Sequence, residues 1–526
     1  MRMRRVVPAI LIAEIGALAF LYLSFCHHIA GAYGFPLDDS WIHAHFARNI
    51  AEGKGIVYNP GQHVTSTAIL YTLMLAAFYA ISLKPIPDAI ALGLLLHLGA
   101  AVLVYMISRR LSLTPVISAI AAIFFAAIPR LIWGALSGME IPLYVFLTCL
   151  GIYWHIRYPW NEGWRAYLAS FAFGLAALAR PECAAFLVCS IADRFISYIR
   201  FDRTKISIPR FLRTLPVHLL IFAAVVAPAA SYNTASYGKP LPPAFYAKTR
   251  SIDAGNMLGA RIAGTATYIK ESITASKRDN LLFCIMLLPG LIACVIASRE
   301  QPRTGILLLP LGLLLIPAAT GIAAPTGPHK SYSQLLMQHG RYSAYLCPLL
   351  SIIGAIGVTA VLSLFSKVRG AKPLLERSAI AAFAITVVLM LASANIMLAQ
   401  HYSKEVGNIN DMQVSLGKWA VSLPSDAVLA VNDAGAIAYF SHHRILDTVG
   451  VVNPEVVPYL NRHKNRNMGL MEYLRERKPD YVIIFPNWYP RIAARRDIFH
   501  PIRSIKLKHN VVCGGQEMVV YKPTWK

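Results

Sequence analysis

Long apolar runs alternate with short polar segments up to about residue 400. A helix that crosses the hydrocarbon core of a bilayer needs about 20 mostly apolar residues. Eleven runs fit this requirement, at about residues 6–28, 86–107, 114–133, 140–157, 165–179, 182–199, 215–231, 280–298, 305–323, 343–366 and 378–400. The pattern predicts a polytopic α-helical membrane protein with about 11 transmembrane helices.

The apolar run from residue 69 to residue 82 is too short to cross and is typical of an interfacial or re-entrant helix. If it does not cross, the loops rich in Lys and Arg all fall on the side of the arginine-rich N-terminus, which the positive-inside rule makes cytoplasmic. These loops are at 109–110, 157–165, 194–213, 299–303 and 367–377. The outer side then holds residues 29–85, a turn at 137–140, a loop at 232–279 and the tail from residue 401.

Composition agrees with a membrane protein and excludes a soluble nucleic-acid binder. The chain is 56% hydrophobic and only 14% charged, whereas about a quarter of the residues of a soluble domain are charged. Its formal net charge is +24, but the Lys and Arg residues gather in loops between apolar runs, which is a topology signal. The eight cysteines show neither a disulfide framework nor metal-ligand spacing.

Residues 401–526 have the pattern of a separate extracytoplasmic α/β domain, following a transmembrane domain at 1–400. β-rich apolar runs at 427–431, 444–452 and 481–485 alternate with helical patterns, which favours a small open parallel sheet. The segment NDAGAIAYF, at 432–440, is typical of a strand-to-helix turn. Its backbone N–H groups could bind an anion, or Asp433 could be the N-cap of the helix.

The sharpest cluster of polar residues, Asp38 and Asp39, directly follows the first apolar run. With Pro36 before them, they predict the start of a helix that runs to about Glu52. One carboxylate or Ser40 would suffice as an N-cap. Repulsion between two adjacent carboxylates would raise the pKa of at least one of them toward the range of a general base, so we expect a catalytic role for the pair.

His43 lies one helical turn after Asp39 and could share a divalent cation with it. No third ligand stands at motif spacing, so no metal or other cofactor is certain.

Further charged residues face the same predicted outer side. Glu140 stands at the start of a predicted span, where an acid also favours the helix dipole. Arg180 and Glu182 share a short turn, so Arg180 either binds an anion such as a lipid phosphate or pairs with Glu182. Other outer candidates for substrate contact are Lys239, Tyr246, Lys248, Arg250, His339 and Arg341, although such cations often meet lipid headgroups and such aromatics often form an interfacial belt.

These residues resemble motifs of the glycosyltransferase C superfamily (GT-C), particularly bacterial relatives of lipid A aminoarabinose transferase, protein O-mannosyltransferases and arabinofuranosyltransferases. The motifs are DDSWIHAHFARNIAEGKGIVYNPGQHVTST, SGMEIPLY, ALARPE, YGKPLPPAFYAK and HGRY. Each is loose alone, but their order and sidedness make the resemblance fairly specific over residues 30–350.

The resemblance implies a GT-C fold and transfer of one sugar from a polyprenyl-phosphate donor to an extracytoplasmic glycan, lipid or protein acceptor. It places the family's first-loop acidic site on Asp38 and Asp39 and the second acid on Glu140. Arg180, Lys248 and Arg341 are then candidates for binding the donor phosphate. The implied location is a bacterial inner membrane, with membrane lipids as surroundings and no nucleic-acid partner. Inversion at the sugar is an expectation from the family alone.

Two other functions stay open at this point. An oligosaccharide polymerase or ligase would share the outer loops but transfer a whole glycan from a lipid diphosphate. A lipid or solute transporter would be expected to carry internal repeats and charges embedded in its spans, and among the acids before residue 400 only Glu14 looks embedded in a span.

Overall fold

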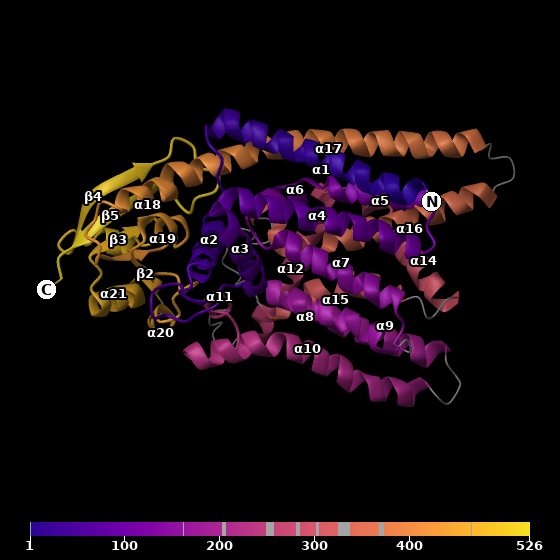
Figure 1. Ribbon diagram of the computed structural model, residues 1–526, viewed down its shortest axis with the longest axis horizontal. Coiled ribbons are helices and arrows are strands. Elements are labelled where there is room, and N and C mark those ends of the chain that lie inside the picture. The colour runs from indigo at the N-terminus through magenta and orange to yellow at the C-terminus, as the bar shows by residue number, and fades with distance from the viewer. Residues whose placement is uncertain are drawn as a thin grey trace.

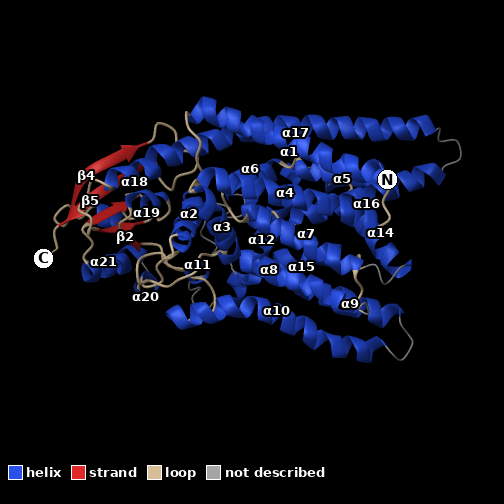
Figure 2. Cartoon of the chain, in the orientation of Figure 1, coloured by secondary structure: helices blue, strands red, loops and turns tan. Residues whose placement is uncertain are grey.

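The computed structural model describes residues 2–160, 163–201, 207–248, 257–279, 284–300, 305–323, 337–367, 373–463 and 465–525. A bundle of long helices carries at one end a small domain that contains a sheet, and the two chain termini lie at opposite ends of the molecule (Figure 1). The strands are confined to that small domain (Figure 2).

The bundle contains these helices: α1 (Arg2–Ala30), α2 (Asp38–Ala51), α3 (Ile69–Ser82), α4 (Pro85–Arg110), α5 (Pro115–Ala126), α6 (Pro129–Leu136), α7 (Ile141–Arg157), η1 (Gly163–Tyr167), α8 (Leu168–Ala179), η2 (Pro181–Ala184), α9 (Ala185–Phe201), α10 (Ser207–Tyr237), α11 (Pro243–Lys248), α12 (Met257–Asp279), α14 (Leu287–Glu300), α15 (Leu308–Ala323), η5 (Met337–Ser343), α16 (Leu346–Lys367) and α17 (Pro373–Ile409).

Five of the described helices are long and apolar enough to cross a membrane, or six if the bent pair α5 and α6 is one span. The chain is therefore a multi-pass membrane protein. The helix expected at 69–82 is confirmed as α3, with 14 residues. The span expected at 114–133 is instead broken, with α5 and α6 at 55° to each other, because Pro129 cannot continue the backbone hydrogen bonds of α5. The outer loop expected at 232–279 is largely helical, since it contains α11 and the 23-residue α12.

The small domain continues from α17 through η6 (Asn410–Val414) and α18 (Ser415–Ala420). Its remaining elements are β1 (Val428–Val431), α19 (Ala436–Ser441), β2 (Arg444–Asp447), α20 (Val456–Arg462), α21 (Arg466–Arg477), β3 (Tyr481–Ile484), α22 (Pro490–Ala493), β4 (Phe499–Lys506) and β5 (Glu517–Pro523). The strand order is β2-β1-β3-β5-β4. The three expected strands pair in parallel, but β4 and β5 add an unexpected antiparallel edge, so the sheet is mixed.

Alternate residues of each central strand enter two separate hydrophobic cores, as the two-residue period of a strand requires. Leu429, Ile445 and Ile483 pack on the side of α18 and α19. Ala430 and Val482 pack with α20 and α21 on the other side. The first core also includes Ile42 and Phe46 of α2 and Tyr58 and Val64 of the following loop, so the segment between α1 and α3 forms part of the small domain's packing.

Directional contacts hold α2 and the loop after it against the small domain. The guanidinium of Arg48 donates to the carbonyl of Tyr439 at 2.6 Å and lies over the Tyr439 ring. The amide of Asn59 pairs with both backbone groups of Ile445, at 2.8 and 2.9 Å. The position of α2 is therefore fixed by the bundle and by the small domain together.

Candidate functional site

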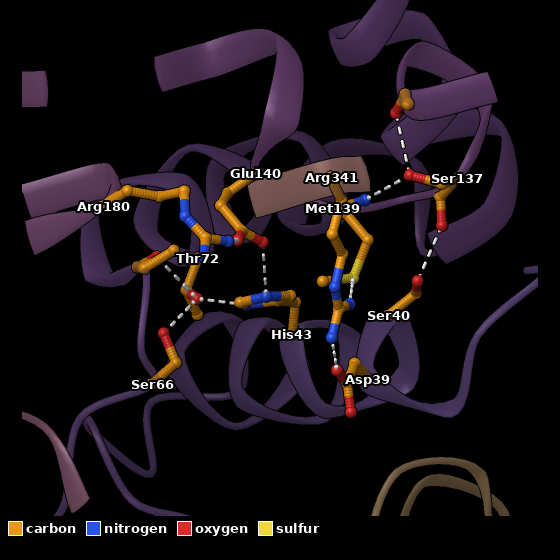
Figure 3. A network of polar contacts seen from close by, with 12 residues as sticks. Asp39, Ser40, His43, Ser66, Thr72, Ser137, Met139, Glu140, Arg180 and Arg341 are labelled. Atoms are coloured by element: carbon orange, nitrogen blue, oxygen red, sulfur yellow. Dashed lines mark hydrogen bonds and ion pairs between the residues drawn. The ribbon is translucent and has the colours of Figure 1, made fainter. Parts of the chain in front are cut away.

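A pocket lies where α2, the turn before α7, the turn after α8 and η5 meet (Figure 3). It is lined by Asp39, Ile42, His43, Ser66, Thr67, Met139, Glu140, Arg180, Arg341, Tyr342, Val451 and Val452. Five residues singled out from the sequence, Asp39, His43, Glu140, Arg180 and Arg341, therefore line one pocket although they come from four separate segments.

Local backbone rules place two of these side chains. Arg180 precedes Pro181, and a residue before proline is driven into extended conformation, so Arg180 has φ −152° and ψ 123° and ends α8. Gly138 turns the chain before Glu140 with a φ of +73°, and a Cβ there would overlap the ring of Phe35. This turn brings Glu140 to the N-terminus of α7.

Asp39 projects from the first turn of α2 and its carboxylate forms an ion pair with Nη2 of Arg341, at 2.7 Å. The two partners differ in exposure, because the Asp39 side chain is 41% exposed whereas that of Arg341 is 5% exposed. Arg341 also contacts Sδ of Met139 and lies over the ring of Tyr342.

Glu140 is almost fully buried and receives a hydrogen bond from Nη1 of Arg180 through its Oε1. Its second oxygen, Oε2, forms a longer ion pair with Nε2 of His43, at 3.4 Å. Burial opposes the charge, but His43 and Arg180 outweigh it and hold the pKa of Glu140 well below its usual range. Glu140 is therefore ionised at neutral pH.

Arg180 also pairs with Glu182 through Nε, at 2.6 Å. This is the Arg–Glu pair that was one of the two alternatives for that turn. The Arg180 guanidinium lies over the ring of Tyr342, which Arg341 contacts as well. Two buried guanidinium groups therefore share one aromatic ring at the base of the pocket.

Asp38 has a different position from Asp39. Its carboxylate accepts hydrogen bonds from the backbone N–H groups of Gly435 and Ala436 at 2.7 and 2.8 Å, and it does not line the pocket. Burial, followed by repulsion from Asp433, raises the pKa of Asp38, and Asp39 contributes less. The sequence argument gave the right direction for this pKa but the wrong main cause, since burial and not the adjacent acid dominates.

The backbone N–H groups that the turn at 432–440 was expected to offer to an anion donate to the carboxyl group of Asp38. The alternative role of Asp433 as helix N-cap is wrong, because its carboxylate accepts instead from Gln413 and Asn432. The alternative that Asp39 or Ser40 is the N-cap of α2 is wrong as well, because Leu37 occupies that position and forms no side-chain hydrogen bond there.

Two of the expected contacts, Tyr246 and His339, lie away from the pocket's lining. Tyr246 lies beside Lys239, whose ammonium is 4.6 Å from the ring centre. Lys248 is the last residue of α11, and its side chain lies outside the described part of the structure. His339 turns toward Glu405, with Nε2 at 2.8 Å from Oε1. Arg250 lies outside the described residues.

Sequence reasoning missed several polar residues around the site. Nδ1 of His43 lies 3.1 Å from the hydroxyl of Thr72, which also bonds Ser66 at 2.6 Å. Isolated hydroxyls in apolar helices give no sequence signal of such contacts.

Sequence reasoning also missed a buried acid that does not line the pocket. Asp193 in α9 bonds His155 at 2.7 Å. Its position among apolar residues, directly before Arg194, could have indicated an embedded carboxylate.

Each carboxylate of the pocket pairs with an arginine, and the two do not converge on a position for a shared metal ion. Asp39 contacts Arg341, and Glu140 contacts Arg180, so two guanidinium groups lie where a divalent cation bound by both acids would be repelled. His43 alone adds too few donors for a zinc site. The two arginines, in contrast, present N–H groups suited to a phosphate.

A family model described as a domain of unknown function matches residues 402–521. No curated protein sequence matches the chain. ArnT from Cupriavidus metallidurans, solved with undecaprenyl phosphate, has a TM-score of 0.60 and 12% identity over 98% of this chain and 97% of that one. The Archaeoglobus fulgidus oligosaccharyltransferase AglB, solved with an inhibitory peptide and a dolichol-phosphate, has a TM-score of 0.59 and 12% identity over 90% and 69%.

Both solved proteins are GT-C glycosyltransferases, and the similarity to ArnT extends over nearly the whole of both chains. The chain therefore has the GT-C fold that its motifs predict.

Proposed function

We propose that this protein is a membrane glycosyltransferase that transfers a single sugar from a polyprenyl-phosphate donor to an acceptor on the extracytoplasmic face of a bacterial inner membrane. The observation that carries the proposal is the pocket in which one accessible carboxylate, Asp39, lies beside two buried guanidinium groups, Arg180 and Arg341. Such a site offers a base to a hydroxyl and cations to a leaving phosphate. Binding of undecaprenyl phosphate by ArnT supports the donor class.

In the proposed reaction, an acceptor hydroxyl oxygen attacks the anomeric carbon of the donor sugar. The bond from that carbon to the phosphate oxygen breaks, and Asp39 takes the hydroxyl proton. Polyprenyl phosphate leaves with the electron pair of the broken bond and with the negative charge that Arg180 and Arg341 stabilise. A positioned base contributes about 10² to 10⁴ in rate, and cations placed where charge develops contribute about as much or more. Inversion at the sugar is proposed from the family resemblance alone.

The Asp39–Arg341 ion pair suggests how donor binding prepares the base. A carboxylate in contact with a guanidinium holds a proton poorly, because the cation favours its ionised form. A donor phosphate would compete with Asp39 for Arg341, and its arrival would free the carboxylate to accept a proton. Lys248, on the neighbouring α11, is a further proposed contact of the phosphate.

Glu140 is proposed to hold a substrate hydroxyl. Its Oε2 atom is buried, lies in a long ion pair with Nε2 of His43, at 3.4 Å, and belongs to a carboxylate that stays ionised. A carboxylate oxygen can accept more than one hydrogen bond, and a hydroxyl of the sugar or acceptor would supply a second. His43 and Glu182 then orient Glu140 and Arg180.

A second candidate is oligosaccharyl transfer from a lipid diphosphate, which the likeness to AglB favours. The two functions separate in one experiment. Purified protein in liposomes is given either labelled polyprenyl-monophosphate sugars or labelled lipid-diphosphate oligosaccharides, with cell-envelope extract as acceptor. Transfer from the monophosphate donors supports the proposal. Transfer from the diphosphate donors alone would replace it with the second candidate.

Arg341→Gln should strongly reduce transfer from the donor that is used. Arg462→Gln is a matched control, because Arg462 also pairs with a carboxylate, that of Glu472, but on the exposed surface of the small domain. Equal activity of the two variants would contradict the phosphate-binding role of Arg341.

A further inference from the structure

A second cluster of ionisable side chains lies outside the pocket, where η5 passes α17. His401 and Glu405 are one turn apart on α17, and His339 comes from η5. Oε1 of Glu405 lies 2.8 Å from Nε2 of His339 and 3.4 Å from Nε2 of His401. One ligand atom from each of the three residues lies within 4.8 Å of the others.

A hydrogen bond from Trp133 holds the Glu405 side chain of this cluster in place. The Glu405 side chain is 3% exposed, and its second oxygen, Oε2, accepts from the indole N–H of Trp133 at 2.7 Å. The His339 ring packs edge-on against both Trp133 and His401. Such an N–H contact fixes which carboxylate oxygen faces the histidines, as partners of metal ligands usually do.

The backbone at His339 is also held in an uncommon conformation. His339 has a φ of +60°, in the left-handed region that non-glycine residues rarely adopt. The segment is fixed by Arg130, which donates to the carbonyl of Gly340 and to the hydroxyl of Ser343, both at 2.9 Å. A strained residue held in place by its surroundings is a frequent feature of functional sites.

We propose that His339, His401 and Glu405 bind a divalent transition-metal ion, with zinc the best fit. Two imidazole nitrogens and one carboxylate oxygen are a common zinc ligand set, with a fourth position for water, whereas Mg²⁺ and Ca²⁺ prefer oxygen ligands alone. Tetrahedral zinc with bonds of about 2.05 Å places its ligands about 3.3 Å apart. The two histidine nitrogens lie 2.8 and 3.4 Å from Oε1 of Glu405, close to this value, and all three ligand atoms lie within 4.8 Å of one another. Partial exposure of the two histidines leaves a route for the ion.

The site would act on the pocket through the chain and without touching substrate. Arg341, which pairs with Asp39, is two residues after His339 in the same short helix. A metal bridging η5 and α17 would hold that helix in place, and so hold Arg341 in place. The metal-binding proposal itself does not depend on the proposed transfer reaction, since its main readout is bound metal.

A network of hydrogen bonds between the same three residues, without metal, is the competing explanation. To separate the two, the full-length protein is purified in detergent, stripped with EDTA, and titrated with ZnCl₂ by calorimetry, with bound zinc measured by mass spectrometry after dialysis. Metal binding predicts one tight zinc per chain. The stripped protein should also bind Co²⁺ with the visible absorption bands of a four-coordinate site.

Three variants assign the site. His401→Gln, at a half-exposed position that should not disturb folding, is expected to weaken zinc binding at least tenfold, and Trp133→Phe to weaken it about 10- to 100-fold by releasing Glu405. His463→Gln is the matched control, because His463 forms a similar pair with Glu472 at 2.9 Å on the surface of the small domain, and it should bind zinc like the wild type. Equal binding by wild type and His401→Gln, or no zinc retained by the wild type, would overturn the proposal. The proposal would also be overturned if His43→Gln lost the tight zinc while His401→Gln kept it, because the ion would then lie in the pocket.

Discussion

The two adjacent aspartates are expected to do different work, and conservative substitution of each tests this. In the wild type, each oxygen of Asp38 accepts one backbone N–H, from Gly435 or Ala436. In Asp38→Asn the remaining oxygen keeps one of these hydrogen bonds, but the amide NH₂ is a donor and cannot accept the other. One of two bonds to a charged acceptor is lost, and such bonds contribute roughly 1.5–3 kcal/mol each. Because burial raises the pKa of Asp38, removing its charge recovers part of this. The net cost is about 1–2 kcal/mol.

The cost should appear where the bonds are made. Amide hydrogen exchange at Gly435 and Ala436 is expected to become about 5- to 30-fold faster in Asp38→Asn, if these amides exchange through local opening. Transfer activity should be largely kept. Asp39→Asn should show the reverse, with unchanged exchange at these two amides and lost activity. Unchanged exchange in Asp38→Asn together with abolished transfer would refute this division of roles.

Three further results are expected. Gly435→Ala should lower the thermal unfolding midpoint, followed by intrinsic fluorescence, because a Cβ there overlaps the carbonyl oxygen of Asp38; an unchanged midpoint would contradict the close contact. Glu140→Gln should also lower the unfolding midpoint, since breaking a buried ion pair costs about 3–5 kcal/mol. Glu182→Gln should lower the midpoint less, because Glu182 is the more exposed of the two carboxylates that pair with Arg180. Burial raises the pKa of Asp433 from 3.8 to about 6, so the folded state binds more protons than the unfolded state between these values and its stability falls as pH rises from about 4 to about 6. The unfolding midpoint of Asp433→Asn should therefore fall less over this window than that of the wild type, and parallel curves would contradict the raised pKa.

The bundle and the parallel strands could be predicted from the sequence because local patterns specify them. Apolar runs of the right length mark helices, and the runs at 427–431 and 481–485 mark buried strands. The antiparallel edge was not predictable in this way. β4 contains Pro501 and most of its residues are exposed, so it shows no apolar alternation, and it pairs only because β5 already lies beside β3.

The candidate site likewise combines features that local patterns predict with features that depend on contacts between distant segments. Residue types and order brought Asp39, Glu140, Arg180 and Arg341 forward, and the fold brings them together. The separation of Asp38 from Asp39 could not be foreseen, since it depends on a turn nearly 400 residues away in the chain. His339 stands next to Arg341 in HGRY, yet the positive φ at His339 directs it to Glu405, a partner in the tail that no local motif indicates.

The most direct test of the central claim is the rate of sugar transfer by Asp39→Asn, measured in liposomes at saturating labelled polyprenyl-phosphate sugar, with Asp39→Glu and Asp38→Asn beside it. If Asp39 is the base, kcat for Asp39→Asn should fall about 10²- to 10⁴-fold. The KM for donor should not rise, because the carboxylate that competes with the donor phosphate for Arg341 is gone. Asp39→Glu should recover part of the rate, and Asp38→Asn should stay near the wild type. Full transfer by Asp39→Asn would contradict the account.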